Sequence, residues 1–112
     1  MDARTYNLDL DGFITYSLRL DKSCAELTMH FRHGQPQNII YYYEDGTFQN
    51  YKGYTEPATM NKDIGKDELK HEFLEGLRSF VHFPDKIKPY KIDDTERETL
   101  TEKINGLIDK LR

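Results

Sequence analysis

Apolar residues in the first half of the chain recur at every second position, the pattern of strands with one buried face. Asp-Gly between alternating segments is a strong hairpin signal, because the turn needs positive φ values that these residues tolerate. Turn residues interrupt the alternation at Asp11-Gly12, Asp21-Lys22-Ser23, Gly34-Gln35-Pro36 and Asp45-Gly46. The pattern predicts five short antiparallel strands: Tyr6–Leu10, Phe13–Leu20, Cys24–His33, Asn38–Glu44 and Thr47–Lys52.

The register of the second predicted hairpin follows from the requirement that apolar and polar side chains lie on opposite faces. A two-residue Lys22-Ser23 loop places all apolar side chains of the two strands on one face and all polar ones on the other. On the polar face, Arg19 then lies opposite Glu26, Ser17 opposite Thr28 and Thr15 opposite His30. The apolar face holds the pairs Leu20–Ala25, Leu18–Leu27, Tyr16–Met29 and Ile14–Phe31.

The two flanking hairpins differ in loop length. In the first, a strict two-residue Asp11-Gly12 loop would put Leu8 on the polar face, so we expect one extra loop residue and Gly12 at a positive φ. At Asp45-Gly46 the two-residue turn is the prediction. It pairs Tyr43 with Phe48, Tyr42 with Gln49 and Ile40 with Tyr51.

The second half changes to helical spacing of apolar residues. It predicts helices over about residues 66–82 and 94–111, the first closed by Pro84 and the second capped at Asp93 with Glu96 reaching back. The stretches 53–65 and 83–93 are expected to be irregular. We therefore predict one α+β domain over residues 1–112, in which an antiparallel meander packs on two C-terminal amphipathic helices. The order of the strands beyond hairpin neighbours, and the face taken by each ring of Tyr41–Tyr43, stay open.

Composition narrows the classes of function. The chain has 112 residues, a formal net charge of -4, fourteen aromatic residues (Tyr 8, Phe 6) and one cysteine. This length is typical of one domain, and the aromatic residues can supply a core. The acidic balance argues against nucleic acid as a direct ligand and against an anionic membrane surface, since both favour basic proteins. A lone cysteine and the absence of a long apolar run favour a cytoplasmic protein that enters no membrane.

Candidate chemistry is sparse. His30 and His33 would point to opposite faces of one strand, and Cys24 lies roughly 20 Å along the strand from His30 at ~3.3 Å per residue. No glycine-rich phosphate loop or second cysteine for a zinc knuckle is present. We therefore expect no metal, no cofactor and no catalytic residue.

Two groups of residues are candidates for binding a partner. Tyrosines gather around the last hairpin and the loop after it, where strand propensity alone could account for them. Tyrosine is also enriched at protein interfaces, because it offers rigid contact area and a hydroxyl. The tyrosine candidates are Tyr41, Tyr43, Tyr51 and Tyr54, and the candidates on the polar sheet face are Arg19, Glu26, His30 and Arg32.

These observations favour a small non-catalytic protein-binding module. It would be an accessory or inhibitor protein acting on a larger partner, as anti-CRISPR and other anti-defence proteins of phages and mobile elements do. The alternative is a small-molecule or nucleotide-ligand binder, or a small enzyme, that uses Arg19, Arg32, His30 and Glu26. A homodimer formed through the edge of the tyrosine-rich strand is compatible with either reading.

Overall fold

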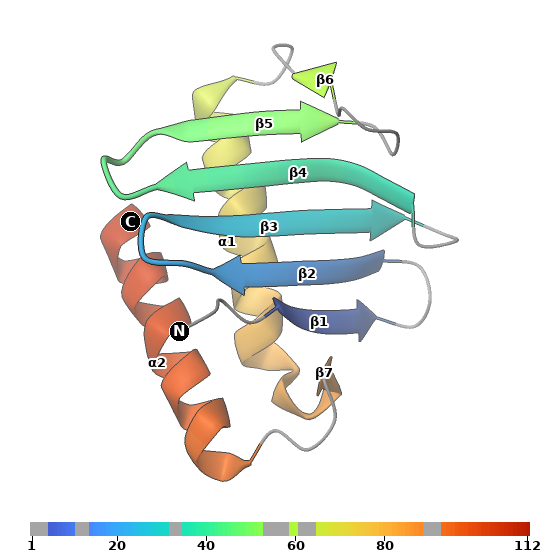
Figure 1. The fold of residues 1–112 in the computed structure, drawn as a ribbon, viewed down its shortest axis with the longest axis vertical. Coiled ribbons are helices and arrows are strands. Elements are labelled where there is room, and N and C mark those ends of the chain that lie inside the picture. Colours follow the sequence, from blue (N-terminus) through green and yellow to red (C-terminus); the bar gives the residue numbers. More distant parts are fainter. Residues whose placement is uncertain (1–4, 11–13, 32–34, 53–58, 61–64, 89–92) are drawn as a thin grey trace.

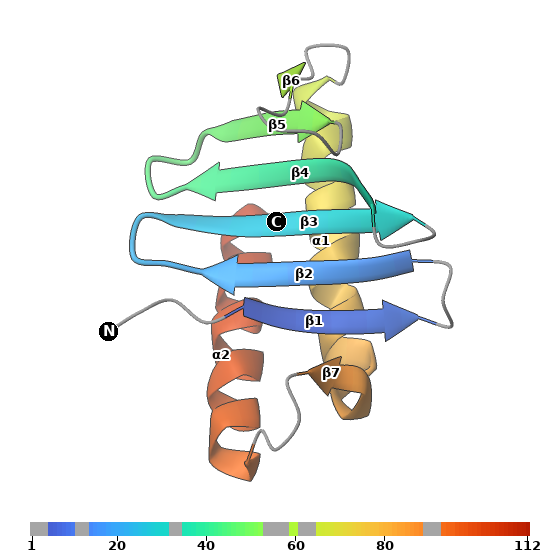
Figure 2. The same cartoon turned by 45° about the vertical axis from the view of Figure 1, so that its right-hand side comes forward.

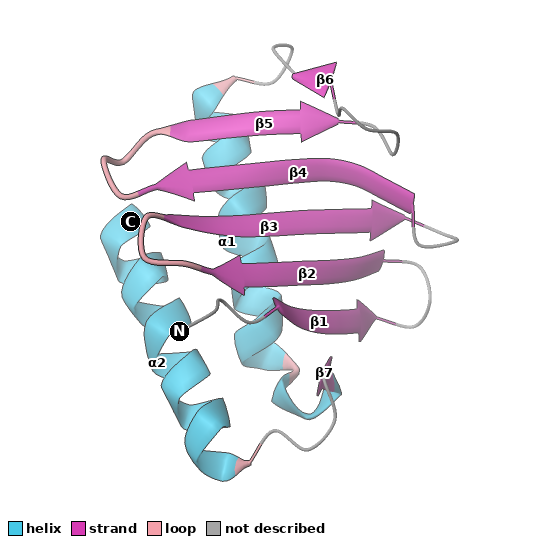
Figure 3. Ribbon diagram, in the orientation of Figure 1, coloured by secondary structure: helices cyan, strands magenta, loops and turns pink. Residues whose placement is uncertain are grey.

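The computed structural model describes residues 5–10, 14–31, 35–52, 59–60, 65–88 and 93–112. Within these ranges the chain forms an antiparallel sheet followed by two helices on one face of it, which confirms the predicted α+β class (Figure 1). Figure 3 shows the two layers, with the strands in front of both helices. Of the helices in the described ranges, none has the length and apolar character needed to cross a membrane.

The sheet has the order β6-β5-β4-β3-β2-β1-β7, so the five long strands follow one another as a meander. The strands are β1 (Thr5–Leu10), β2 (Ile14–Leu20), β3 (Cys24–Phe31), β4 (Gln35–Tyr43), β5 (Phe48–Lys52), β6 (Thr59–Met60) and β7 (Ile87–Lys88). The helices are α1 (Lys66–His82), a 3-10 turn η1 (Pro84–Lys86) and α2 (Asp94–Leu111).

The register of β1, β2 and β3 is the one predicted from placing apolar and polar side chains on opposite faces. Leu18 pairs with Leu27, Arg19 with Glu26, and all seven pairs of the β2–β3 ladder agree. In the first hairpin Leu10 pairs with Ile14, which confirms the three-residue loop. The conformation of that loop, Gly12 included, lies outside the described residues.

The predicted two-residue turn at Asp45-Gly46 is wrong by one residue. The amide of Tyr43 donates to the Thr47 carbonyl, and the amide of Gly46 donates to the Tyr43 carbonyl, both at 2.9 Å. Gly46 has φ +90°, so the loop is a three-residue turn that ends in a left-handed glycine. Asp45 favours this turn because its carboxylate accepts hydrogen bonds from both the amide and the hydroxyl of Thr47.

That longer turn changes which residues share a face. The β4–β5 ladder pairs Tyr42 with Phe48, Tyr41 with Gln49, Ile40 with Asn50 and Ile39 with Tyr51. Tyr42 therefore points into the core, where it is 5% exposed, while its two neighbours in sequence point outward.

Strands also occupy stretches that the pattern left irregular. β6 pairs with the end of β5, and β7 pairs with the middle of β1. β4 begins at Gln35, three residues before its predicted start, and includes Pro36. Proline is tolerated there because the described β4–β5 pairing starts only at Asn38, so Pro36 has a strand partner on one side alone. β4 thus lies between β3 and β5, so both of its edges are covered and a homodimer cannot form by pairing along the edge of this strand.

The core lies between the sheet and the helices and includes buried side chains of both. On α1, Phe73, Leu77 and Phe80 are 0–1% exposed, as the helical stripe predicts. Leu27 of β3 lies directly against Gly76 of α1: a Cβ atom at Gly76 would lie 2.4 Å from Leu27 Cδ2. Glycine at this position lets α1 approach the centre of the sheet.

A polar network enters this core near the start of α1. Asn38 donates to Glu72 Oε2 at 2.8 Å, and Asn50 donates to the side-chain oxygen of Asn38 and to the Ile39 carbonyl. Asn38 and Asn50 are 8% and 4% exposed. Partial burial raises the pKa of Glu72, and nearby Glu68 adds to the shift. The network ties α1 to β4 and β5 by directional bonds in an otherwise apolar layer.

The two helix glycines should respond oppositely to alanine. A Cβ at Gly106 meets nothing within 4 Å, so Gly106→Ala should raise the free energy of unfolding by about 0.5–1 kcal/mol through helix propensity. Gly76→Ala makes the same propensity gain but overpacks Leu27, at a cost of about 1–3 kcal/mol. In urea unfolding, the free energy of unfolding of Gly76→Ala should be at least about 1 kcal/mol lower than that of Gly106→Ala. Equal stabilities would contradict the Leu27 contact.

Candidate functional site

The outer face of the sheet is the surface that neither helix covers, since both helices lie on the opposite side (Figures 1 and 2). Three tyrosines meet there: Tyr41 and Tyr43 from β4 and Tyr51 from β5. Each is partly exposed. We refer to Tyr41, Tyr43 and Tyr51 as the tyrosine patch.

The rings of the tyrosine patch are held together by mutual contact and by one amide. Tyr41 stacks on Tyr43 with ring centroids 6.2 Å apart, and meets the edge of Tyr51 at 5.6 Å. The hydroxyls of Tyr43 and Tyr51 donate to Gln49 Oε1 at 3.0 and 3.1 Å. Ring pairs at such distances are mutually stabilising. The patch is therefore an ordered aromatic surface on two neighbouring strands.

Partial burial and neighbouring acidic groups raise the pKa of two tyrosines of the patch, Tyr41 and Tyr43. Burial and the nearby Glu26 carboxylate raise the pKa of Tyr41. Burial and the nearby Tyr51 raise the pKa of Tyr43. At neutral pH both hydroxyls can donate hydrogen bonds.

Cys24 borders the patch, as the strand partner of Tyr43. Burial, with Asp21 and Glu26 close by, raises the pKa of its thiol. The thiol is therefore protonated at neutral pH and a poor nucleophile, which agrees with its expected role as a half-buried small residue.

The polar candidates continue the same face toward β2. Arg19 and Glu26 are partners across β2 and β3, and Glu26 is also the strand partner of Tyr41. Arg19 is exposed, so the patch has a cation and an anion on its β3 side. The structure thus brings Arg19 and Glu26 together with the tyrosine patch.

His30 lies farther along β3 and takes part in a different group. Its Nε2 lies 3.3 Å from the hydroxyl oxygen of Ser17, whose proton goes to Asn7 Oδ1 at 2.6 Å. This contact is a diagonal one between β2 and β3, and it agrees with the predicted register, in which Ser17 lies opposite Thr28 and Thr15 opposite His30. With its proton on Asn7, Ser17 can only accept from His30, which is not the arrangement of an activated nucleophile.

Two candidates, Tyr54 and Arg32, lie outside the described residues. Among the residues that the structure does describe, no group of three or more His, Cys, Asp or Glu side chains could hold a metal ion. Comparisons of the chain with protein-family models, curated proteins and solved structures gave no significant match. Its function is therefore argued from its own surface.

The electrostatics of the patch can be tested residue by residue. In a tyrosine ¹³Cζ NMR titration, Tyr41 should titrate above its usual pKa of about 10. Glu26→Gln should lower that pKa, because removing the carboxylate removes part of the penalty on the phenolate. Glu98→Gln, on the exposed side of α2, is the matched control and should leave Tyr41 unchanged. An unshifted Tyr41, or equal effects of the two variants, would contradict the geometry.

Proposed function

We propose that this protein is a non-catalytic binding module that recognises a larger protein through the tyrosine patch. The observation that carries the proposal is the clustering of Tyr41, Tyr43 and Tyr51 on a sheet face that neither helix covers. Tyrosines are enriched among the residues that dominate interface energetics, because each buries a large rigid ring at small entropic cost.

The fixed arrangement of the rings also favours a binding role for the tyrosine patch. The shared hydrogen bonds to Gln49 fix two of the rings before any partner arrives. A preorganised surface loses less conformational entropy on binding than one that must be ordered. Arg19 and Glu26 at its border would add polar contacts at the rim, where they set orientation more than affinity.

The proposed partner is a protein with an exposed apolar or aromatic surface and hydrogen-bond donors that can bond to the hydroxyl oxygens of Tyr43 and Tyr51, whose own protons go to Gln49. The formal net charge of -4 makes nucleic acid a poor direct ligand. We place such a module in the cytoplasm, as an accessory or inhibitor protein; an anti-defence inhibitor is one member of that class. The alternative is a ligand site of Arg19, Arg32, His30 and Glu26. Arg32 lies outside the described residues, and the other three side chains do not line the groove between α2 and the strand ends.

Site-specific photocrosslinking tests the proposal. A benzophenone amino acid in place of Tyr51 should crosslink one dominant protein in the native cell extract. The same group in place of Asn105, exposed on α2, is the matched control and should not. With the captured protein purified, the variant Tyr41→Ala/Tyr51→Ala should bind about thirty-fold more weakly, the loss expected from truncating interface hot spots.

Two controls separate recognition from folding. Thr5→Ala, exposed at the far end of the sheet, should bind like the wild type. Each variant should keep a cooperative unfolding transition. An unchanged affinity of the double variant, or no crosslink specific to position 51, would overturn the proposed function.

A further inference from the structure

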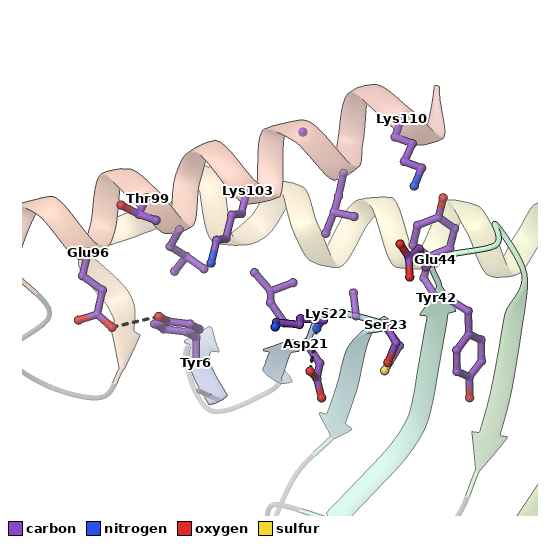
Figure 4. Close-up of a pocket in the computed structure, with 17 residues that line it drawn as sticks. Tyr6, Asp21, Lys22, Ser23, Tyr42, Glu44, Glu96, Thr99, Lys103 and Lys110 are labelled. Atoms are coloured by element: carbon purple, nitrogen blue, oxygen red, sulfur yellow. Dashed lines mark hydrogen bonds between the residues drawn. The ribbon is translucent and has the colours of Figure 1, made fainter. Parts of the chain in front are cut away.

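A groove lies between α2 and the adjoining ends of the sheet strands, separate from the centre of the outer sheet face (Figure 4). It has a volume of about 810 Å³ and is bordered by the β2–β3 turn, the end of β4 and one side of α2. This volume lies within the range of ~300–1,000 Å³ that small-ligand sites occupy.

The groove has an apolar lining. Leu20 and Ala25 contribute from the sheet, and Leu100 and Leu107 from α2. The ring of Tyr42 lines the end of the groove near the C-terminus of α2. An apolar group of a ligand could bury its surface there.

Three lysines line this groove: Lys22, Lys103 and Lys110. Lys103 and Lys110 project from the same side of α2 toward the strand ends (Figure 4). Within the described residues none of the three forms an ion pair, and Lys110 Nζ lies 5.8 Å from the ring centre of Tyr42. The ammonium groups are thus available for an anion beside an apolar surface.

Acidic residues also line the groove, but two of them are already engaged. Glu96 accepts a hydrogen bond from Tyr6 at 3.0 Å, and Asp21 accepts one from the Lys22 amide at 2.7 Å. Glu44 is the third and lies near the Tyr42 end of the groove. These carboxylates keep their charge, so the lining carries three lysines and three acids. An anion would therefore be held by direct contact with a lysine ammonium group and not by a net positive charge of the groove.

Gly106 also lines the groove, between Lys103 and Lys110. It is exposed, and a Cβ there would meet nothing within 4 Å. Its position places no packing constraint on α2.

We propose that this groove binds a small amphipathic anion. Its apolar body would lie on Leu20, Leu100 and Leu107. Its acidic headgroup, a carboxylate or sulfonate, would accept charge-assisted hydrogen bonds from Lys103 or Lys110, which line different parts of the groove. This activity is distinct from recognition of a protein by the tyrosine patch.

Anilinonaphthalene sulfonate has this chemistry and reports its own binding by fluorescence. The wild-type protein should bind it at one site per chain, and decanoate should displace it while inorganic sulfate should not. Lys103→Met/Lys110→Met, which keeps the apolar stems, should weaken binding about ten-fold. Lys66→Met, exposed on α1, is the matched control and should bind within two-fold of the wild type.

Leu107→Glu should abolish the one-site binding, because it places a carboxylate on the apolar lining of the groove. Asn105→Glu, at an exposed position of α2 outside the lining, is the matched control and should bind as the wild type does. Cooperative urea unfolding of every variant excludes dye binding to a loosened core. No binding to the wild type, or equal binding by Leu107→Glu and Asn105→Glu, would overturn the proposal. The tyrosine-patch variant should keep its dye affinity, so either proposal can fail without the other.

Discussion

The contact of Leu27 with Gly76 sets the spacing between the sheet and the first helix. Leu27 is on the central strand of the five-stranded meander and is 1% exposed, so it has little room to move when α1 approaches. A Cβ at Gly76 would require the Leu27 side chain to shift. α2 packs beside α1, and its buried side chains Leu100, Ile104, Ile108 and Leu111 join the same core as those of the sheet.

Much of the fold follows from patterns that are local in sequence. The β2–β3 register could be predicted because a one-residue slip would exchange every apolar and polar side chain of both strands. The bounds of α1 and α2 follow from apolar spacing, from Pro84, and from Asp93, whose carboxylate accepts from the Glu96 amide. The turn after Tyr43 could not be predicted this way. Both faces of that strand carry apolar residues, so their alternation does not distinguish a two-residue turn from a three-residue turn. β6 and β7 are too short to show a period, and they form because the sheet edges offer unpaired backbone groups.

The sequence predicted that tyrosines of this hairpin form the candidate site, but not which of them share a face of the sheet. Counting tyrosines identifies the hairpin, yet only the three-residue turn decides that Tyr41, Tyr43 and Tyr51 share a face while Tyr42 enters the core. The groove could not be predicted from the sequence, because its lining comes from segments far apart in the chain. Cys24 and Tyr43 line the groove, and they also border or belong to the patch. The two surfaces therefore adjoin at the end of β4.

The outward alignment of the three tyrosines is the claim on which the proposed function depends, and aromatic nuclear Overhauser effects test it most directly. The structure predicts cross-peaks between the rings of Tyr41 and Tyr51, whose centres are 5.6 Å apart, and between Tyr42 and Phe73, at 5.8 Å. A two-residue turn would instead place Tyr51 opposite Ile40, on the face of the sheet that Tyr42 shares. Cross-peaks from Tyr51 to Ile40 and Tyr42, with none to Tyr41, would contradict the patch.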